Sequence, residues 1–244
     1  MSEHAAKAVP PAADSPKSVG RWAWEWLKSI AVALVIWMVL RTLLIEAFRI
    51  PSSSMERTLL VGDFLFVNKA LYGAEVPLVH AHLPAFREPK RGDIVVFDSR
   101  TQEGVKVVKR LIGMPGDTLE MKRGRLYRNG VLQREPYVQR LDSLSDTADA
   151  EMRWQLQYLL PRVDKTHYQP SRDVWGPLVV PPDSFFVMGD NRDNSYDSRY
   201  WGFVPRNVIR GRPLFVYYSF ESEPWRVAPF LTAIRWGRIG TMPR

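Results

Sequence analysis

Three consecutive serines, Ser52, Ser53 and Ser54, form the cluster in this chain that most suggests covalent chemistry. They follow Pro51 and lie directly downstream of the most apolar segment of the sequence. A serine cluster alone is most often a turn or a helix cap, because serine hydroxyls bond nearby backbone amides. The chain contains no cysteine, so a thiol nucleophile, a disulfide and a thiolate zinc site are excluded. Serine is therefore the candidate nucleophile.

The four histidines do not suggest a base or a metal site. They are scattered through the sequence, and only His80 and His82 lie close together. That spacing is too short a pattern to propose a metal site, and a solvated loop explains it better. We expect neither a metal nor a cofactor.

A lysine could activate serine instead, since Ser–Lys is a known variant of the serine-hydrolase arrangement. Such a lysine must be neutral at the working pH, and burial can lower its pKa from about 10.4. Lowering it by ~2 units costs about 3 kcal/mol. Lys109 is the candidate, because it interrupts an apolar strand predicted over residues 105–113. An edge-strand lysine that blunts aggregation is the competing explanation. Lys106 alternates to the opposite face and is the natural control.

The elements that must position these residues are predicted to be mainly β-strands. With 244 residues, 45% of them hydrophobic, the chain can bury a sizeable core. Asn129-Gly130 between two short apolar runs is a strong hairpin signal. The polar stretch 189–199 is either a solvated turn or a functional loop, and residues 141–175 are irregular, typical of an insertion. Short apolar runs at the following positions predict the other strands: 64–67, 91–97, 105–113, 118–121, 185–188 and 214–218.

A helix that could span a membrane is predicted near the N-terminus. Residues 1–21 are rich in Ala, Pro, Ser and Lys and predict a disordered tail. The apolar run of residues 22–46 reaches the roughly 20 residues that a bilayer requires, with Trp22, Trp24 and Trp26 suited to its interface. A buried core helix is the alternative. A cleaved signal peptide is disfavoured because the run is followed by no small-x-small site.

The charge is strongly basic and uneven. The formal net charge is +8, and residues 206–244 hold seven arginines against two acidic residues. Such a balance indicates an anionic partner, either nucleic acid or lipid headgroups.

Four blocks of the chain, taken together, resemble the bacterial type I signal peptidases, which are membrane-anchored serine proteases. These blocks are residues 52–59, 91–95, 109–117 and 189–199. The chain departs from the family pattern at Ser53, where glycine is most frequent, and at Arg57, where proline or serine is usual. Both positions lie in the turn that carries the nucleophile.

The resemblance implies a role for each matched residue. It makes Ser54 the nucleophile and Lys109 the general base, with Ser195 orienting the lysine amine. Ser52 and the Ser54 backbone N–H would form the oxyanion hole. A supporting salt-bridge network would comprise Arg110, Asp190, Asp197 and Arg199, in a pairing that the sequence does not assign. The residues expected to line shallow pockets for Ala at substrate positions −1 and −3, or else simply to pack in the core, are Phe48, Ile50, Met55, Leu59, Val107 and Val108.

The resemblance also implies the organisation of the chain. We expect a mainly β, antiparallel catalytic core (residues 47–118 and 184–220) with an inserted β-rich subdomain (119–183). A transmembrane anchor (22–46) follows the tail (1–21), and a basic aromatic segment (221–244) contacts anionic lipid. The partners would be signal peptides and lipids rather than nucleic acid. The protein would be a monomer in the cytoplasmic (inner) membrane, with its N-terminus in the cytoplasm and its catalytic domain outside.

Two rival functions remain at this point. A self-cleaving repressor would use the same chemistry but would be soluble and would carry a DNA-binding domain, which the predicted anchor argues against. A catalytically inactive, membrane-anchored scaffold would have no reason to keep Ser54, Lys109 and Ser195 together.

Overall fold

The computed structural model describes residues 19–244 except 74, 77–80, 83, 142–145 and 222–227. Most of the predicted disordered tail and part of the predicted lipid-binding segment, with Trp225 and Arg226, therefore lie outside the described residues. The chain divides into two compact units, residues 1–40 and 41–244, and each is described by itself.

One long helix, α1 (Val19–Leu43), forms nearly all of the described part of the first unit. Its 25 residues extend about 37 Å at 1.5 Å per residue, enough for a hydrocarbon core of ~30 Å. The segment Val19–Arg41 has a mean hydropathy of 1.6 and none of it is buried. The helix is thus compatible with a membrane anchor, and its exposure argues against the buried core helix considered above. It begins and ends three residues earlier than predicted, because Ile45 and Glu46 belong to the first strand.

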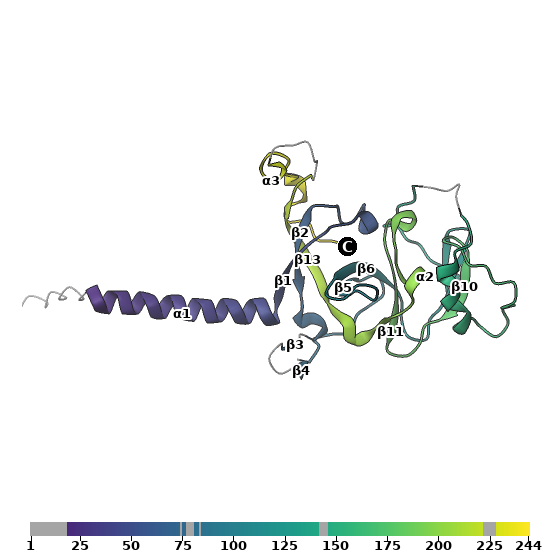
Figure 1. The fold of residues 1–244 in the computed structure, drawn as a ribbon, viewed down its shortest axis with the longest axis horizontal. Helices are drawn as coiled ribbons and strands as arrows, with labels where there is room; N and C mark the ends of the chain where they lie inside the picture. The colour runs from purple at the N-terminus through teal and green to yellow at the C-terminus, as the bar shows by residue number, and fades with distance from the viewer. Residues whose placement is uncertain (1–18, 74, 77–80, 83, 142–145, 222–227) are drawn as a thin grey trace, which may run out of the picture. The chain divides into compact units, whose positions relative to one another are not determined.

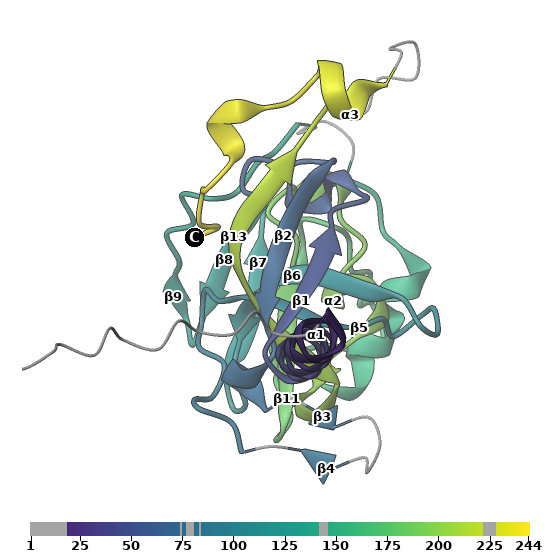
Figure 2. The ribbon, with the colours of Figure 1, turned by 90° about the vertical axis from the view of Figure 1, so that its left-hand side faces the viewer.

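The second unit is built on a curled, seven-stranded antiparallel sheet (Figures 1 and 2), which confirms the predicted mainly β fold. Strand β6 lies between β5 and β11, so it is an interior strand of this sheet. The sheet has the order β1-β2-β13-β5-β6-β11-β12. Its strands are β1 (Ile45–Arg49), β2 (Asp63–Asn68), β5 (Ile94–Asp98), β6 (Lys106–Gly113), β11 (Ser184–Met188), β12 (Val204–Pro205) and β13 (Ile209–Ser219).

A four-stranded antiparallel sheet with the order β10-β7-β8-β9 lies within the residues predicted as the insertion. Its strands are β7 (Thr118–Lys122), β8 (Arg125–Arg128), β9 (Val131–Leu132) and β10 (Trp175–Val179). The predicted hairpin is confirmed, since β8 and β9 pair across Asn129-Gly130. Both turn residues have positive φ, 51° and 79°, which Asn and Gly tolerate best. A two-stranded ribbon, β3 (Glu75–Val76) and β4 (Ala81–His82), contains His82, which was expected in a solvated loop.

Short helical turns connect these strands. Two of them carry candidate site residues, η1 (Ser53–Met55) and η4 (Arg192–Asn194). The sequence pattern predicted no element in residues 141–175, yet η3 (Ala150–Gln157) forms there, capped by Asp149. The other turns are η2 (Ala70–Tyr72), α2 (Ser198–Trp201), η5 (Arg206–Val208), α3 (Pro229–Thr232) and η6 (Trp236–Arg238).

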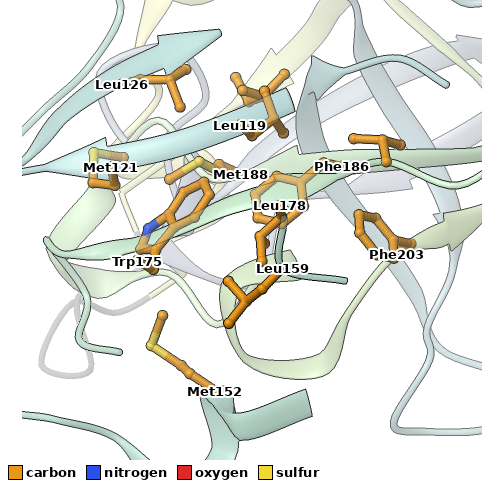
Figure 3. Close-up of a cluster of buried hydrophobic side chains, with 12 residues drawn as sticks. Leu119, Met121, Leu126, Met152, Leu159, Trp175, Leu178, Phe186, Met188 and Phe203 are labelled. Carbon is orange, nitrogen blue, oxygen red and sulfur yellow. The ribbon is translucent and has the colours of Figure 1, made fainter. Parts of the chain in front are cut away.

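Three buried clusters hold the second unit together. The cluster in Figure 3 joins the four-stranded sheet to β11, with the Trp175 and Phe186 rings 5.1 Å apart. A second cluster includes Met55, Leu59 and Val108, and so lies directly under the nucleophile turn. A third includes Val95 and Leu111 and fixes the other face of β5 and β6. The strands that carry the candidate site are therefore packed on both faces.

Candidate active site

The serine cluster folds as a tight turn at the base of a closed loop. Ile50 N–H donates to the Asp63 carbonyl (2.9 Å) and Gly62 N–H donates back to the Ile50 carbonyl (3.0 Å), which ties the two ends of the loop together. Between them Ser54 lies in η1 and is 8% exposed. Main-chain hydrogen bonds therefore hold the turn, while Ser54 still reaches the surface.

Lys109 lies on β6 opposite Val95 and is 4% exposed. Its Nζ lies 2.6 Å from Ser54 Oγ, and within the described chain this hydroxyl is its only hydrogen-bond partner. The edge-strand explanation is wrong, because β6 has neighbours on both sides. Lys106 lies on the opposite face and pairs with Glu46 at 2.5 Å. The structure thus brings Ser54 and Lys109 together, whereas Lys106 is bound by Glu46 and has no hydrogen bond to either of them among the described residues.

Burial lowers the pKa of Lys109 to about 8. Removal from water disfavours the ammonium form and is the largest cause. The charges of Asp197 and Asp190 act in the opposite direction, and that of Arg199 acts in the same direction as burial. At mildly alkaline pH a large fraction of this lysine is therefore neutral and able to accept a proton.

The first acid–base pair of the predicted network is Asp197 with Arg199, and neither side chain is exposed. Arg199 Nε donates to Asp197 Oδ1 at 2.8 Å. Ser195 Oγ and Gly189 N–H donate to Asp197 Oδ2 at 2.7 and 3.0 Å. Asp197 thus fixes the Ser195 hydroxyl beside the site, and the hydrogen bonds of the described residues include none from Ser195 to Lys109.

The second pair is Asp190 with Arg110, which follows Lys109 on β6 and is equally buried. Arg110 donates to both carboxylate oxygens, at 2.7 and 2.6 Å, the fork geometry that favours guanidinium–carboxylate pairs. Thr58 Oγ1 donates to Asp190 Oδ2 at 2.5 Å. This pair therefore connects strand β6, which carries Lys109, to the loop of residues 50–63 that carries Ser54, here called the nucleophile loop. The structure thus assigns the acid–base pairs that the sequence left open.

Two cavities adjoin the Ser54–Lys109 pair. The smaller, of about 160 Å³, is lined by Phe48, Ile50, Met55, Val107 and Val108 as well as Ser52 and Lys106. The larger, of about 390 Å³, is lined by polar loops and by Phe97, Tyr196 and Trp201. Ser52, Ser54 and Lys109 line both, so a chain crossing from one cavity to the other would pass over the reacting groups.

Two of the predicted site residues, Leu59 and Ser52, contribute less directly to the site than expected. Leu59 has no exposed surface and lines neither cavity, so it packs beneath the turn. Ser52 Oγ lies 3.5 Å from Ser54 Oγ, at the outer limit of a hydrogen bond. It is positioned near the hydroxyl without a strong bond to it.

Ser53 and Arg57, the two residues that depart from the family pattern, each have a hydrogen-bond partner in this chain. Ser53 Oγ accepts a hydrogen bond from Asn194 Nδ2 at 2.6 Å. Arg57 has φ +82°, a strained value for a side-chain-bearing residue, and its guanidinium donates to the Val138 carbonyl at 2.9 Å. The turn therefore keeps its geometry through contacts with neighbouring loops.

Sequence reasoning did not assign roles to Gly189 and Asn191. A Cβ at Gly189 would lie 2.2 Å from Ser195 Oγ and 2.4 Å from the Ser54 carbonyl, so only glycine fits. Asn191 N–H donates to the Ser54 carbonyl (3.1 Å) and its side chain to the Ser53 carbonyl (3.2 Å). Their place in the polar stretch 189–199 was the only signal. Among the described residues, no cluster of three or more His, Cys, Asp or Glu could hold a metal ion.

Comparison with known proteins identifies the family of this chain. Residues 23–218 match the protein family described as "Signal peptidase, peptidase S26". The "Signal peptidase I" of Pseudomonas aeruginosa is 38% identical over 212 residues, covering 81% of this chain and 73% of that protein. The "Signal peptidase I" of Bacillus amyloliquefaciens is also 38% identical, covering 85% and 93%. That of Leptolyngbya laminosa is 35% identical and covers 85% of both. The chain therefore belongs to the signal peptidase family, peptidase S26, and is a serine endopeptidase that cleaves signal peptides.

Proposed function

We propose that this chain cleaves signal peptides through a Ser54–Lys109 dyad and a covalent acyl-enzyme. The observation that carries the proposal is the 2.6 Å contact between Lys109 Nζ and Ser54 Oγ. It is supported by the burial of the lysine, which lowers its pKa to about 8. A neutral amine at this distance can accept the hydroxyl proton directly.

In the reaction, neutral Lys109 takes the proton of Ser54 as its Oγ attacks the scissile carbonyl. The resulting ammonium then protonates the leaving amine, which restores the neutral lysine. The same lysine deprotonates the water that hydrolyses the acyl-enzyme. No step uses a metal or a cofactor.

The oxyanion of the tetrahedral intermediate would be stabilised by the Ser52 hydroxyl and the Ser54 backbone N–H. One such donor is worth about 3 kcal/mol of transition-state stabilisation in serine proteases. Ser195 would orient the lysine amine, because Asp197 holds its hydroxyl next to the site. Reorientation of the Ser195 oxygen toward the amine in the substrate complex is part of this proposal.

Specificity for small residues at substrate positions −1 and −3 follows from the smaller cavity. Its lining is mainly apolar, with Phe48, Ile50, Met55, Val107 and Val108 beside the reacting groups, Ser52 and Lys106, and its volume is about 160 Å³. A shallow apolar cavity of this kind accepts alanine and excludes bulkier side chains. We therefore propose Ala-x-Ala sites as the substrates.

We further propose that the enzyme works at the surface of the cytoplasmic membrane. Helix α1 would anchor it with the N-terminus in the cytoplasm and the second unit outside. Near the C-terminus Phe230, Leu231 and Trp236 are 50%, 66% and 73% exposed, and apolar and aromatic side chains of this kind suit a lipid interface. The partners are signal peptides and lipids rather than nucleic acid, and the protein acts as a monomer.

The test is cleavage of a preprotein with an Ala-x-Ala site in detergent, by the wild type, Ser54→Ala, Lys109→Ala and the control Lys106→Ala. We expect both dyad variants to lose activity while the control keeps it. A folded wild type that cuts nothing would favour an inactive scaffold. Normal cleavage by Lys109→Ala would show that another group is the base.

A further inference from the structure

The last residues of the chain return to the outer side of the nucleophile loop. Arg238 donates to the Thr58 carbonyl at 3.0 Å and forms an ion pair with the Asp63 carboxylate. Arg235 donates to the Val61 carbonyl at 2.9 Å. Two arginines thus bind the chain at three points after the serine turn: Thr58, Val61 and Asp63, the first residue of β2.

This C-terminal segment is itself fixed to strand β13. Thr241 accepts from Val216 N–H (2.9 Å), Gly240 N–H donates to the Val216 carbonyl (2.8 Å), and Arg235 N–H donates to the Ser219 carbonyl (2.9 Å). Figure 2 shows the yellow segment descending beside β13. The arginines therefore extend from a supported backbone.

The same segment reaches the strand that carries the lysine. Arg110, the neighbour of Lys109, donates to the Arg244 main-chain oxygen at 3.1 Å. Arg110 also binds Asp190, which accepts from Thr58. The C-terminal segment consequently contacts both the loop that carries Ser54 and the strand that carries Lys109.

The positive charge of Arg238 is neutralised by an ion pair within the protein. Its side chain is 23% exposed and its partner Asp63 is fully buried. Asp63 also accepts from Ser219 Oγ at 2.7 Å and from Leu60 N–H at 2.9 Å. A guanidinium held in this way is poorly placed to bind a lipid phosphate, although the sequence had suggested that role for the basic tail.

We propose that residues 235–244 form a clamp that positions the nucleophile loop against Lys109, with Arg238 as its main positioning residue. The proposal rests on the Ser54–Lys109 mechanism and extends it. The clamp holds the loop from its outer side, while Asn191 and Asp190 hold it from within. Removing the outer contacts would let Ser54 move away from the lysine and would admit water around the amine.

The kinetic test uses the full chain in detergent with a soluble peptide substrate, so that lipid plays no part. The variants are Arg238→Ala, Arg238→Lys and, as control, Arg206→Ala, which removes a pair with the exposed Glu88. We expect Arg238→Ala to lower kcat per folded molecule about 10- to 100-fold with little change in KM. The acid limb of its kcat–pH profile should move to higher pH, because hydration restores the ammonium form of Lys109. Arg238→Lys should recover part of the loss.

A purely structural role would lower the folded fraction and leave the pH midpoint unchanged. An unchanged kcat in Arg238→Ala would overturn the proposal. So would a loss that occurs only with lipid vesicles, because it would indicate that Arg238 binds lipid.

Amide hydrogen exchange gives a readout that does not depend on activity. We expect faster exchange over residues 55–63 in Arg238→Ala, but not in Arg206→Ala, and the same result in a Ser54→Ala background. Unchanged exchange in this loop would overturn the clamp even if the wild type cleaves. If the wild type does not cleave at all, the proposed function fails, and exchange still decides whether the clamp exists.

Discussion

The two faces of strand β6 present lysines only three residues apart, yet these lysines are in opposite situations. On one face Lys106 is partly exposed and forms an ion pair with Glu46. On the other face Lys109 is buried and contacts a hydroxyl, with burial lowering its pKa to about 8.

The difference lies in how the nearby carboxylates are used. Lys106 is paired directly with Glu46, which also lies 4.0 Å from Lys69 Nζ. The two acids near Lys109 are instead each bound by an arginine: Asp197 by Arg199 and Asp190 by Arg110. Because their charge is largely neutralised, these acids stabilise the lysine ammonium less than free carboxylates would. The comparison indicates that a lysine becomes a base when it is buried and its carboxylate neighbours are already paired.

The largest effect should come from removing the reacting groups on the buried face. We expect Lys109→Met and Ser54→Ala each to lower kcat/KM at least about 10³-fold, because neither acylation nor deacylation then has its proton acceptor or nucleophile. Cleavage of an Ala-x-Ala preprotein measures this, with Lys106→Met as the matched control. Equal losses in Lys106→Met and Lys109→Met would remove the distinction between the two faces.

Breaking a buried pair on the same face should mainly affect stability. Arg199→Met leaves the Asp197 carboxylate buried without its cation, and we expect a loss of about 3–5 kcal/mol in the free energy of unfolding. Urea denaturation measures this loss. In the molecules that remain folded, the unpaired Asp197 should raise the pKa of Lys109. The acid limb of the pH–activity profile should then move to higher pH. A variant as stable as the wild type would show that this pair does not support the site.

Removing the buried lysine should stabilise the fold at neutral pH even though it abolishes activity. Below pH 8 the folded protein must keep a buried ammonium, and a pKa lowered from 10.5 to about 8 corresponds to about 3 kcal/mol. Between pH 8 and 10.5 the unfolded state binds more protons, so wild-type stability should rise and the advantage of Lys109→Met should disappear. Urea denaturation at pH 7 and pH 10.5 tests this. A Lys109→Met variant that is less stable at pH 7 would contradict the expectation.

The smallest effect should come from the exposed face. Glu46→Gln removes the ion pair with Lys106, and we expect less than about 1 kcal/mol of lost stability, decreasing further with salt. Thermal unfolding at low and high salt measures this, and cleavage activity should remain at the wild-type level. A large loss of activity would mean that Lys106 also serves the site.

The strands, the serine cluster and the candidate lysine could be predicted from the sequence because their signals are local. Apolar runs located the strands, Asn129-Gly130 located the hairpin, and an out-of-place lysine in the run 105–113 pointed to Lys109. The resemblance to a known family then singled out Ser54 among the three serines and added Ser195 and the loop of residues 189–199.

The remaining features depend on contacts between distant segments, which no local pattern encodes. The pairing of Asp197 with Arg199 and of Asp190 with Arg110 depends on how loop 189–199 folds onto β6. Leu59 looked like a pocket residue from its position in the motif, but the packing of the second cluster places it in the core. The return of Arg238 to the nucleophile loop brings together residues 175 positions apart.

The most direct test of the central claim is the titration of Lys109 itself, followed by ¹⁵N NMR of the lysine amines in Ser54→Ala. The Lys109 signal is identified by its loss in Ser54→Ala/Lys109→Met. We predict that this signal titrates near pH 8, well below the ordinary lysine pKa of about 10.4. If the Lys109 signal instead titrates near that ordinary value, the amine is charged at working pH and cannot be the general base.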